Sequence, residues 1–509
     1  MAAWRWRDRL GLAWALLLAA AIPAQGSTAS LDFAAVQAQA EALAAESYHD
    51  PAAIEGELAR IGYDQYLAIH MRPTSVLWAD EPGFFRVKLF PAGFLYQLPV
   101  TLEVIDGDSV TPVVARDSDF DWSQANLQEP PPAAVPLAGF RVLFPLHRPD
   151  KDDEVLVFLG ASYFRLLGRE QAFGISARGL AIDTGLPQGE QFPFFRHFWL
   201  VKPAEGAREL TVYALLDSPS VAGAYRFVLR PGTDSSVEVT ASLFLRDEVE
   251  LLGLAPLTSM FLAGENDERR AGDLRPEVHD SDGLLIASGQ GEWLWRPLAN
   301  PPRLTVTAFG DKDTQGFGLL QRDRDFDHYR DLAANYDRRP GYWVEPLSGW
   351  GEGEIRLLEI PTDAEFHDNV TALWAPRNPP GAGSRLDVAY RLTAALDHVA
   401  PPPAGHVTAT FSGSVALPGS AGEDRRRRVI VEFSGGDLDW LDPSQPVEAV
   451  ATLGGGQQTG LRVEALPDRR GWRAILDFDP GGAEALDLRL FLRLYDQVLT
   501  ETWTYRWTP

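Results

Sequence analysis

The segment Val237-Glu238-Val239-Thr240-Ala241-Ser242-Leu243-Phe244-Leu245-Arg246 indicates most directly what fold this chain adopts. Apolar side chains occupy every second position from Val237 to Leu245, and mostly polar ones lie between them. Because successive side chains of a strand point to opposite faces, this period of two predicts a sheet with one buried face. Similar runs recur, and the 45 Gly and 38 Pro fit many turns between them. The sequence therefore predicts an all-β protein.

Helical spacing occurs only near the beginning of the chain. Apolar residues between 31 and 48 recur at the spacing of one amphipathic helix, and residues 52–61 suggest a second, shorter one.

A proline-rich spacer, Pro401-Pro402-Pro403-Ala404-Gly405, separates two strand-rich segments. Residues 401–509 contain short alternating strands, ending in Leu486, Leu488, Leu490, Leu492 and Leu494. Their number and pattern suit an immunoglobulin-like sandwich. We therefore expect a large β domain over residues 27–400 and a smaller one over 401–509.

Residues 1–26 have the features of a secretory signal peptide. Arg5, Arg7 and Arg9 precede an apolar run from Leu10 to Ile22, which small residues follow. No later stretch reaches the roughly 20 apolar residues that a membrane helix needs. We expect an exported protein without a membrane span, stabilised without disulfides because the chain has no cysteine.

The formal net charge of −25 argues against nucleic acid or an anionic membrane as the partner. The 15 Trp, 13 Tyr and 26 Phe include flat faces on which sugar rings could stack, although most aromatic side chains of any protein are core.

Common catalytic and metal-binding motifs are missing or incomplete. Asp323, Asp325 and Asp327 imitate the start of a calcium loop, but His328 stands at its sixth position and Ala334 at its twelfth. There is no Gly-x-Ser-x-Gly elbow and no cysteine nucleophile, and the nine His lack zinc spacing. We expect neither a metal nor another cofactor.

Several distinctive blocks follow one another along the chain. They are Tyr63-Asp64-Gln65-Tyr66, Gly160-Ala161-Ser162-Tyr163-Phe164-Arg165, residues 176–184 and 192–199, Ala255-Pro256-Leu257-Thr258-Ser259-Met260-Phe261, Arg275-Pro276-Glu277-Val278-His279-Asp280-Ser281-Asp282-Gly283, Gly341-Tyr342-Trp343-Val344-Glu345-Pro346 and Glu501-Thr502-Trp503-Thr504-Tyr505-Arg506-Trp507. Together they run through nearly the whole chain and resemble the osmoregulated periplasmic glucan biosynthesis family (OpgG/OpgD, MdoG-like).

This resemblance implies a large galactose-mutarotase-like β-sandwich followed by the immunoglobulin-like domain, located in the periplasm. It also implies action on β-1,2-glucan. Some relatives resemble inverting endo-β-1,2-glucanases, and others resemble transglycosylases that close glucan rings. The alternative is a non-catalytic glucan-binding protein that assists a membrane glucan synthase. A mutarotase acting on free sugars is a weaker third reading.

Two acidic residues match the catalytic positions of the family. Asp368, in Phe366-His367-Asp368-Asn369-Val370, matches the position where the family carries its general acid. Asp280 matches the position where the family places the base. Trp374 could provide the apolar surroundings that raise the pKa of Asp368. From spacing alone, an ordinary turn is the favoured explanation for each aspartate, and it is the resemblance that favours catalysis. In the family, acid and base are thought to act through a substrate hydroxyl and a chain of waters.

Residues between these acids supply further candidates. Tyr336 matches a family position near the reacting centre, and Arg338 could orient a carboxylate. Stacking subsites could come from Tyr342, Trp343 and Trp350, although Trp343 suits the core equally well. Glu345 is a reserve carboxylate. The loops expected to decide between hydrolysis and transfer are residues 265–272 and 323–339.

Overall fold

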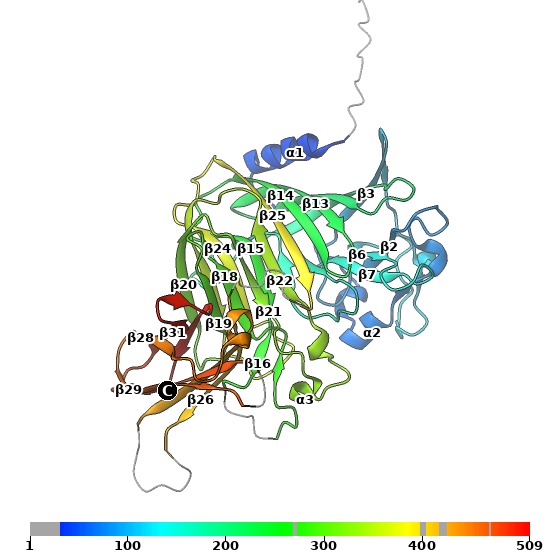
Figure 1. The fold of residues 1–509 in the computed structure, drawn as a ribbon. Coiled ribbons are helices and arrows are strands. Elements are labelled where there is room, and N and C mark those ends of the chain that lie inside the picture. Colours follow the sequence, from blue (N-terminus) through cyan, green and yellow to red (C-terminus); the bar gives the residue numbers. More distant parts are fainter. Residues whose placement is uncertain (1–30, 268–271, 398–403, 417–424, 468–469) are drawn as a thin grey trace, which may run out of the picture.

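The computed structural model describes residues 31–267, 272–397, 404–416, 425–467 and 470–509 of the chain. Strands dominate it, so the predicted all-β class is confirmed (Figure 1). The expected signal peptide over 1–26 lies outside the described residues. Within the described part, no helix is long and apolar enough to cross a membrane. Helices beyond the first are short: α2 (Tyr63–Leu67), α3 (Phe326–Tyr329), and the 3₁₀ turns η1 (Leu58–Arg60), η2 (Pro73–Ser75), η3 (Asp117–Asp119), η4 (Tyr336–Arg338) and η5 (Gly436–Trp440).

The helix expected over 31–48 is confirmed as α1 (Phe33–Ala45). The carboxylate of Asp32 caps it by accepting a backbone hydrogen bond within its first turn. Its buried Val36 packs in one cluster with Trp199, so α1 covers the outer face of a large sheet (Figure 1).

The second helix, expected over 52–61, is wrong, because only the 3₁₀ turn η1 forms there. Backbone groups of this segment bond to another part of the chain. The N–H of Ile54 donates to Gln97 at 2.9 Å, and the carbonyl of Leu58 accepts from Phe94 at 3.0 Å. These tertiary bonds satisfy groups that a helix would have paired internally.

Two large sheets form the main body (Figure 1). The first has ten strands, which are β2 (Arg86–Pro91), β6 (Leu137–Phe144), β7 (Asp153–Leu159), β8 (Tyr163–Leu166), β9 (Ser176–Arg178), β15 (Leu252–Ser259), β24 (Val370–Pro376), β23 (Glu352–Glu359) and β20 (Thr305–Lys312), with β10 (Ala181–Ile182) beside β15.

The second large sheet has fifteen strands. They are β28 (Val447–Leu453), β31 (Leu486–Leu494), β33 (Thr502–Trp507), β19 (Trp293–Pro297), β18 (Gly283–Ala287), β21 (Gly316–Leu320), β22 (Gly341–Pro346), β25 (Arg385–Ala395), β14 (Ser235–Leu245), β13 (Val221–Arg230), β12 (Leu210–Asp217), β11 (Phe194–Val201), β3 (Thr101–Asp106) and β4 (Ser109–Pro112), with β32 (Gln497–Val498) beside β31.

These two sheets pack face to face around one core. Phe140 of the first sheet lies edge-on to Phe198 of the second, with ring centroids 5.1 Å apart. Phe158 and Phe227 meet across the same interface at 5.0 Å. The period-two segment quoted above is β14, and its alternating apolar side chains from Val237 to Leu245 are all buried in this core.

Phe244 departs from the pattern of β14 for a local reason. It lies on the opposite face of the strand from its apolar neighbours, and it is buried in the cluster beneath α1. The helix therefore covers a face of the sheet that water would otherwise reach.

Three smaller sheets complete the fold. They are β1 (His70–Met71) with β5 (Phe120–Asp121), β16 (Phe261–Ala263) with β17 (Val278–His279), and the four-stranded sheet β26 (His406–Ser414), β27 (Arg427–Ser434), β30 (Trp472–Asp479) and β29 (Gln457–Ala465).

The C-terminal strands share hydrogen bonds and a core with the large sandwich. Strand β33 runs parallel to β19, pairing Trp503 with Trp295. A second core cluster joins Val429 and Trp503 to Trp295 and Trp343 from earlier in the chain. The expected junction spans residues 401–405, of which 401–403 lie outside the described residues, and the division at 401 stays a prediction.

Candidate active site

A groove runs over β7 and β8 and reaches the loop before β24. One pocket of about 330 Å³ and an adjoining pocket of about 220 Å³ share the segment at Tyr96 and the segment at Tyr163, so the two are continuous. We call this groove the aromatic groove, and its defining residues are Leu95, Tyr96, Tyr163, Arg165, Phe192 and Asp368. Open aromatic faces beside charged groups suit a sugar chain.

Asp368 stands at one end of this groove, in the loop between β23 and β24. Its side chain is accessible to water but lies in a recess, where burial raises the pKa of its carboxyl and Arg165, Arg178 and Arg339 act in the opposite direction. An accessible acid with a raised pKa is suited to delivering a proton to a ligand in the groove.

The neighbouring Asn369 fixes the position of Asp368. Its buried side chain accepts a hydrogen bond from the N–H of Phe261 at 2.8 Å, and it donates to the carbonyls of Phe261 and Ile360, each at 2.9 Å. A buried amide with three hydrogen bonds holds the end of the loop in one place.

Asp280 directly follows β17 and is only 4% exposed. Burial and, to a smaller extent, the charge of Asp368 raise the pKa of Asp280, whereas the Arg339 guanidinium lowers it. The net result is a pKa of about 6. Asp280 also forms an ion pair with Arg339. Since Asp368 affects the pKa of Asp280, and Arg339 affects the pKa of both, the three groups belong to one electrostatic cluster.

Arg339 is held by its surroundings as well as by Asp280. Its guanidinium lies 4.1 Å from the ring centroid of Tyr336 and donates to the carbonyl of Ala334. Gly174 makes room for it, because a Cβ there would meet Arg339 Cδ at 2.8 Å. The sequence placed the orienting arginine one position earlier, at Arg338.

Arg338 instead points away from this cluster. Its side chain is 63% exposed, and its Nε lies 4.0 Å from the carboxylate of Asp337. The two adjacent arginines leave the chain in different directions at the end of η4, and no sequence pattern distinguishes them.

Tyr336 is 2% exposed and lies close to the acids. Its hydroxyl donates to Glu365 Oε2 at 3.1 Å, and burial raises the pKa of the phenol. The structure therefore brings Tyr336, Asp280 and Asp368 to one site, with Tyr336 contacting a third carboxylate that sequence reasoning missed.

Arg275 connects the loops around this site. Its guanidinium bonds to Asp273 at 2.9 Å, to Asp331 at 3.1 Å and to Glu365 at 2.6 Å. These partners lie in the segment before β17, in the loop before η4 and in the loop that carries Asp368. Bidentate and shared carboxylate contacts of arginine favour one fixed geometry.

Under the activity that the resemblance implies, replacing Arg275 with Lys is expected to lower kcat on linear β-1,2-glucan by about tenfold, because an ammonium ion cannot reach three carboxylates in the planar geometry of the guanidinium. Arg303, whose exposed side chain pairs with Glu484, supplies the control substitution to Lys. Steady-state kinetics on the two variants checks this. Equal rates for both would show that Arg275 does not position the loops.

Buried charge also shapes the wall of the aromatic groove. Arg178 is buried and paired with Glu190, and its guanidinium lies 5.4 Å from the ring of Tyr163 and 5.2 Å from that of Phe192. Thr184 donates to the same Glu190 at 2.8 Å. Apart from Glu190, these residues lie in the quoted blocks over 160–165, 176–184 and 192–199, which is the signal that could have identified them.

Three aromatic candidates lie in the core rather than along the groove. Tyr342 is fully buried, and its hydroxyl bonds to the backbone of Leu166. Trp343 belongs to the second core cluster and stacks on Trp293 at 6.0 Å. Trp374 is fully buried in the main core. Tyr342 and Trp343 are neighbours in β22 and point to opposite faces of the sheet, and each face is covered by one of the two cores.

The other two candidates, Trp350 and Glu345, do not line the aromatic groove either. Trp350 is half-buried and packs 6.0 Å from Trp374. Glu345 is exposed and pairs with Arg391 at 2.9 Å across neighbouring strands.

One group of side chains has metal-ligand spacing within the described part of the chain. Ligand atoms of Glu277, Asp323 and His328 all lie within 4.8 Å of one another. The two carboxylates already contact imidazole rings, Glu277 that of His279 at 2.9 Å and Asp323 that of His328 at 2.5 Å. The group is therefore internally paired, and its spacing alone does not indicate an ion.

Comparison with known proteins gives one consistent result. A family model described as "Periplasmic glucan biosynthesis protein, MdoG" matches residues 31–507. "Glucans biosynthesis protein D" of Stenotrophomonas maltophilia (strain R551-3) is 43% identical over 490 residues, covering 95% of this chain and 91% of the relative.

Two further relatives also carry the name of a glucan biosynthesis protein. "Glucans biosynthesis protein D 1" of Ralstonia nicotianae is 43% identical, with 96% of this chain and 93% of the relative covered. "Probable glucans biosynthesis protein D" of Shewanella oneidensis is 40% identical, with 94% and 88% covered. Among solved structures, the Slr1438 protein of Synechocystis aligns with a TM-score of only 0.16 at 10% identity, over 69% of this chain and 100% of that one.

Proposed function

This chain belongs to the MdoG family of periplasmic glucan biosynthesis proteins, and from that premise we propose that it cleaves or transfers β-1,2-glucosidic bonds of a glucan with inversion. Its site of action would be the aromatic groove, and its place of action the periplasm that the family description names. Asp368 acts as the general acid and Asp280 as the base.

The observation that carries this proposal is the electrostatic link between these two aspartates. Both carboxyls have a raised pKa, each is affected by Arg339, and only Asp368 opens into the groove. Pairs of carboxyls in different environments, one accessible and one buried, are typical of acid and base assignments in glycoside hydrolases.

The burial of Asp280 determines how it would act. Its carboxylate contacts Arg339 and is nearly inaccessible, so it does not reach a sugar or its attacking water directly. A proton must travel to it through a substrate hydroxyl and water, as the resemblance implied. Asp368 would protonate the departing oxygen while that relay removes a proton from the nucleophile. Water as nucleophile gives hydrolysis, and a glucan hydroxyl gives transfer.

Tyr336 and Arg339 would hold this arrangement in place. Arg339 keeps the carboxylate of Asp280 ionised near neutral pH, because a positive charge lowers the pKa that burial has raised. Tyr336 packs under Arg339 and anchors Glu365, which lies three residues before Asp368.

Incubation of the mature chain with linear β-1,2-glucan tests the proposal. Mass spectrometry is expected to show shorter or cyclic products, and proton NMR at early times should show the α-anomer at newly formed reducing ends if water is the nucleophile. A polymer that binds and stays unchanged would contradict the enzyme and support the alternative of a carrier that assists a membrane glucan synthase.

A further inference from the structure

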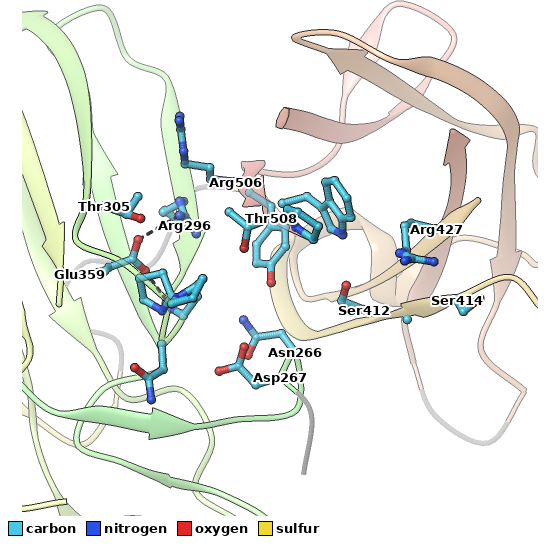
Figure 2. Close-up of a pocket in the computed structure, with 18 residues that line it drawn as sticks. Asn266, Asp267, Arg296, Thr305, Glu359, Ser412, Ser414, Arg427, Arg506 and Thr508 are labelled. Carbon is cyan, nitrogen blue, oxygen red and sulfur yellow. Dashed lines mark hydrogen bonds and ion pairs between the residues drawn. The ribbon is translucent and has the colours of Figure 1, made fainter. Parts of the chain in front are cut away.

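A second pocket, separate from the aromatic groove, lies where the large sandwich meets the C-terminal strands (Figure 2). Its volume is about 390 Å³, within the range of about 300–1,000 Å³ typical of small-molecule sites. One wall comes from β19 and β23, and the facing wall from β26, β27 and β33. It shares no lining residue with the groove.

Asp267 supplies an unused acceptor at this pocket. Its Oδ2 is buried and has no hydrogen-bond partner within the described part of the chain. Burial and, to a smaller extent, the charge of Glu359 raise the pKa of Asp267, whereas a hydrogen bond from the backbone N–H of Asn300 lowers it. The net result is a pKa of about 7. Because a buried polar oxygen without a partner is costly, a donor from a bound molecule would stabilise it.

The other charges of the pocket are mostly paired. Arg296 contacts Glu359 at 3.1 Å, and Arg506 contacts Asp487 at 3.1 Å. Arg427 lies 6.0 Å from the ring of Trp507 and makes no ion pair among the described residues. In Figure 2 Arg427 and Asp267 stand on different sides of the opening, so a donor and an acceptor remain and their charges offset each other.

This combination fits a neutral ligand that both donates and accepts hydrogen bonds. A strongly anionic ligand would be repelled by Asp267, and a cationic one by Arg427, once each is ionised. Sugar hydroxyls donate to carboxylates and accept from guanidinium groups, so they satisfy both.

We propose that this junction pocket is a second glucan-binding site, which holds a neutral glucose segment outside the aromatic groove. The choice of glucan as the sugar rests on the proposed function. The site would hold a distant part of the same polymer, or a second chain, while the groove holds the bond that reacts.

Hydrogen exchange measured by mass spectrometry tests the two sites separately. Full-length mature protein is compared with and without a short linear β-1,2-gluco-oligosaccharide. We expect protection of groove segments 160–166 and 176–184 and, at the junction, of segments 296–302 and 505–509.

Two arginine variants then test local recognition. Arg427→Gln should raise the oligosaccharide concentration that gives half-maximal protection at the junction by about tenfold, which is the loss expected for one charge-assisted hydrogen bond. Protection of the groove should stay unchanged. Arg425→Gln is the matched control, because Arg425 is exposed nearby in sequence and does not line the pocket. Asp267→Asn should weaken junction protection in the same way.

The outcomes separate this inference from the proposed function. Protection of the groove alone would overturn the junction site and leave the proposed function standing. Protection nowhere would overturn both, and equal losses for Arg425→Gln and Arg427→Gln would overturn the recognition described here. Protection at both places, with selective loss at the junction in Arg427→Gln, supports the second site.

Discussion

Asp368→Asn is expected to lower kcat on linear β-1,2-glucan by about 10²–10⁴-fold, the usual contribution of general acid catalysis. The amide keeps the shape of the side chain but cannot deliver a proton to the departing oxygen. Glucan should still bind, because the aromatic walls of the groove are unchanged.

The fold should survive this substitution. Burial disfavours the charged form of Asp368, and Asn369, not Asp368, makes the hydrogen bonds that fix the loop. Thermal unfolding should therefore show no loss of stability, and this separates a chemical defect from misfolding.

Asp363→Asn is the matched control for Asp368→Asn, since Asp363 is an exposed aspartate of the same loop and does not line the groove. Product formation is followed by mass spectrometry for both variants and for the unchanged protein. Near-normal turnover by Asp368→Asn would contradict the assignment of the general acid.

Arg339→Met is expected to change the pH dependence of activity. Arg339 lowers the pKa of Asp280, so removing the guanidinium raises that pKa above its present value of about 6. Each unit by which the pKa of Asp280 exceeds the working pH reduces the ionised fraction of its carboxyl about tenfold. Activity at pH 7 should fall by about tenfold or more, and the acidic limb of the profile should move to higher pH.

Stability should respond to the same change with a defined sign. A carboxyl whose folded pKa is raised favours the folded state below its unfolded pKa and loses that contribution as pH rises through the folded value. In Arg339→Met the loss should be small at pH 5. It should reach about 3–5 kcal/mol at pH 8, the cost typical of leaving one partner of a buried ion pair unpaired.

Arg338→Met is the control, because Arg338 is exposed and lies one residue away. Kinetics from pH 5 to 9 and urea unfolding at pH 5 and 8 provide the measurements. If both variants lose activity equally at every pH, Arg339 has no specific effect on Asp280.

Local sequence patterns predicted the strands well, because the polarity of each strand residue indicates whether the face on which it lies is buried or exposed. In β14 the alternating apolar side chains are buried as predicted, and on the opposite face Ser242 and Phe244 are buried as well, because α1 covers them there. The segment 52–61 failed because bonds to Gln97 and Phe94, distant in sequence, replaced those of a helix.

Which aromatic side chains line the groove also depended on parts of the chain that are distant in sequence. Tyr342, Trp343 and Trp374 are close in sequence to the acids, yet their strands direct them into the two cores. Tyr96 and Tyr163 line the groove from strands and loops more than 200 residues before Asp368 in the chain.

The sequence by itself determined the all-β class, the first helix and the family, because strand period, helical spacing and long ordered motifs are properties of neighbouring residues. Tertiary structure alone decided that Arg339 rather than Arg338 pairs with Asp280, and that Asp280 is buried while Asp368 stays open to the groove. Charge and burial act through space, so the pKa of each acid depends on groups that the chain brings together only when it folds.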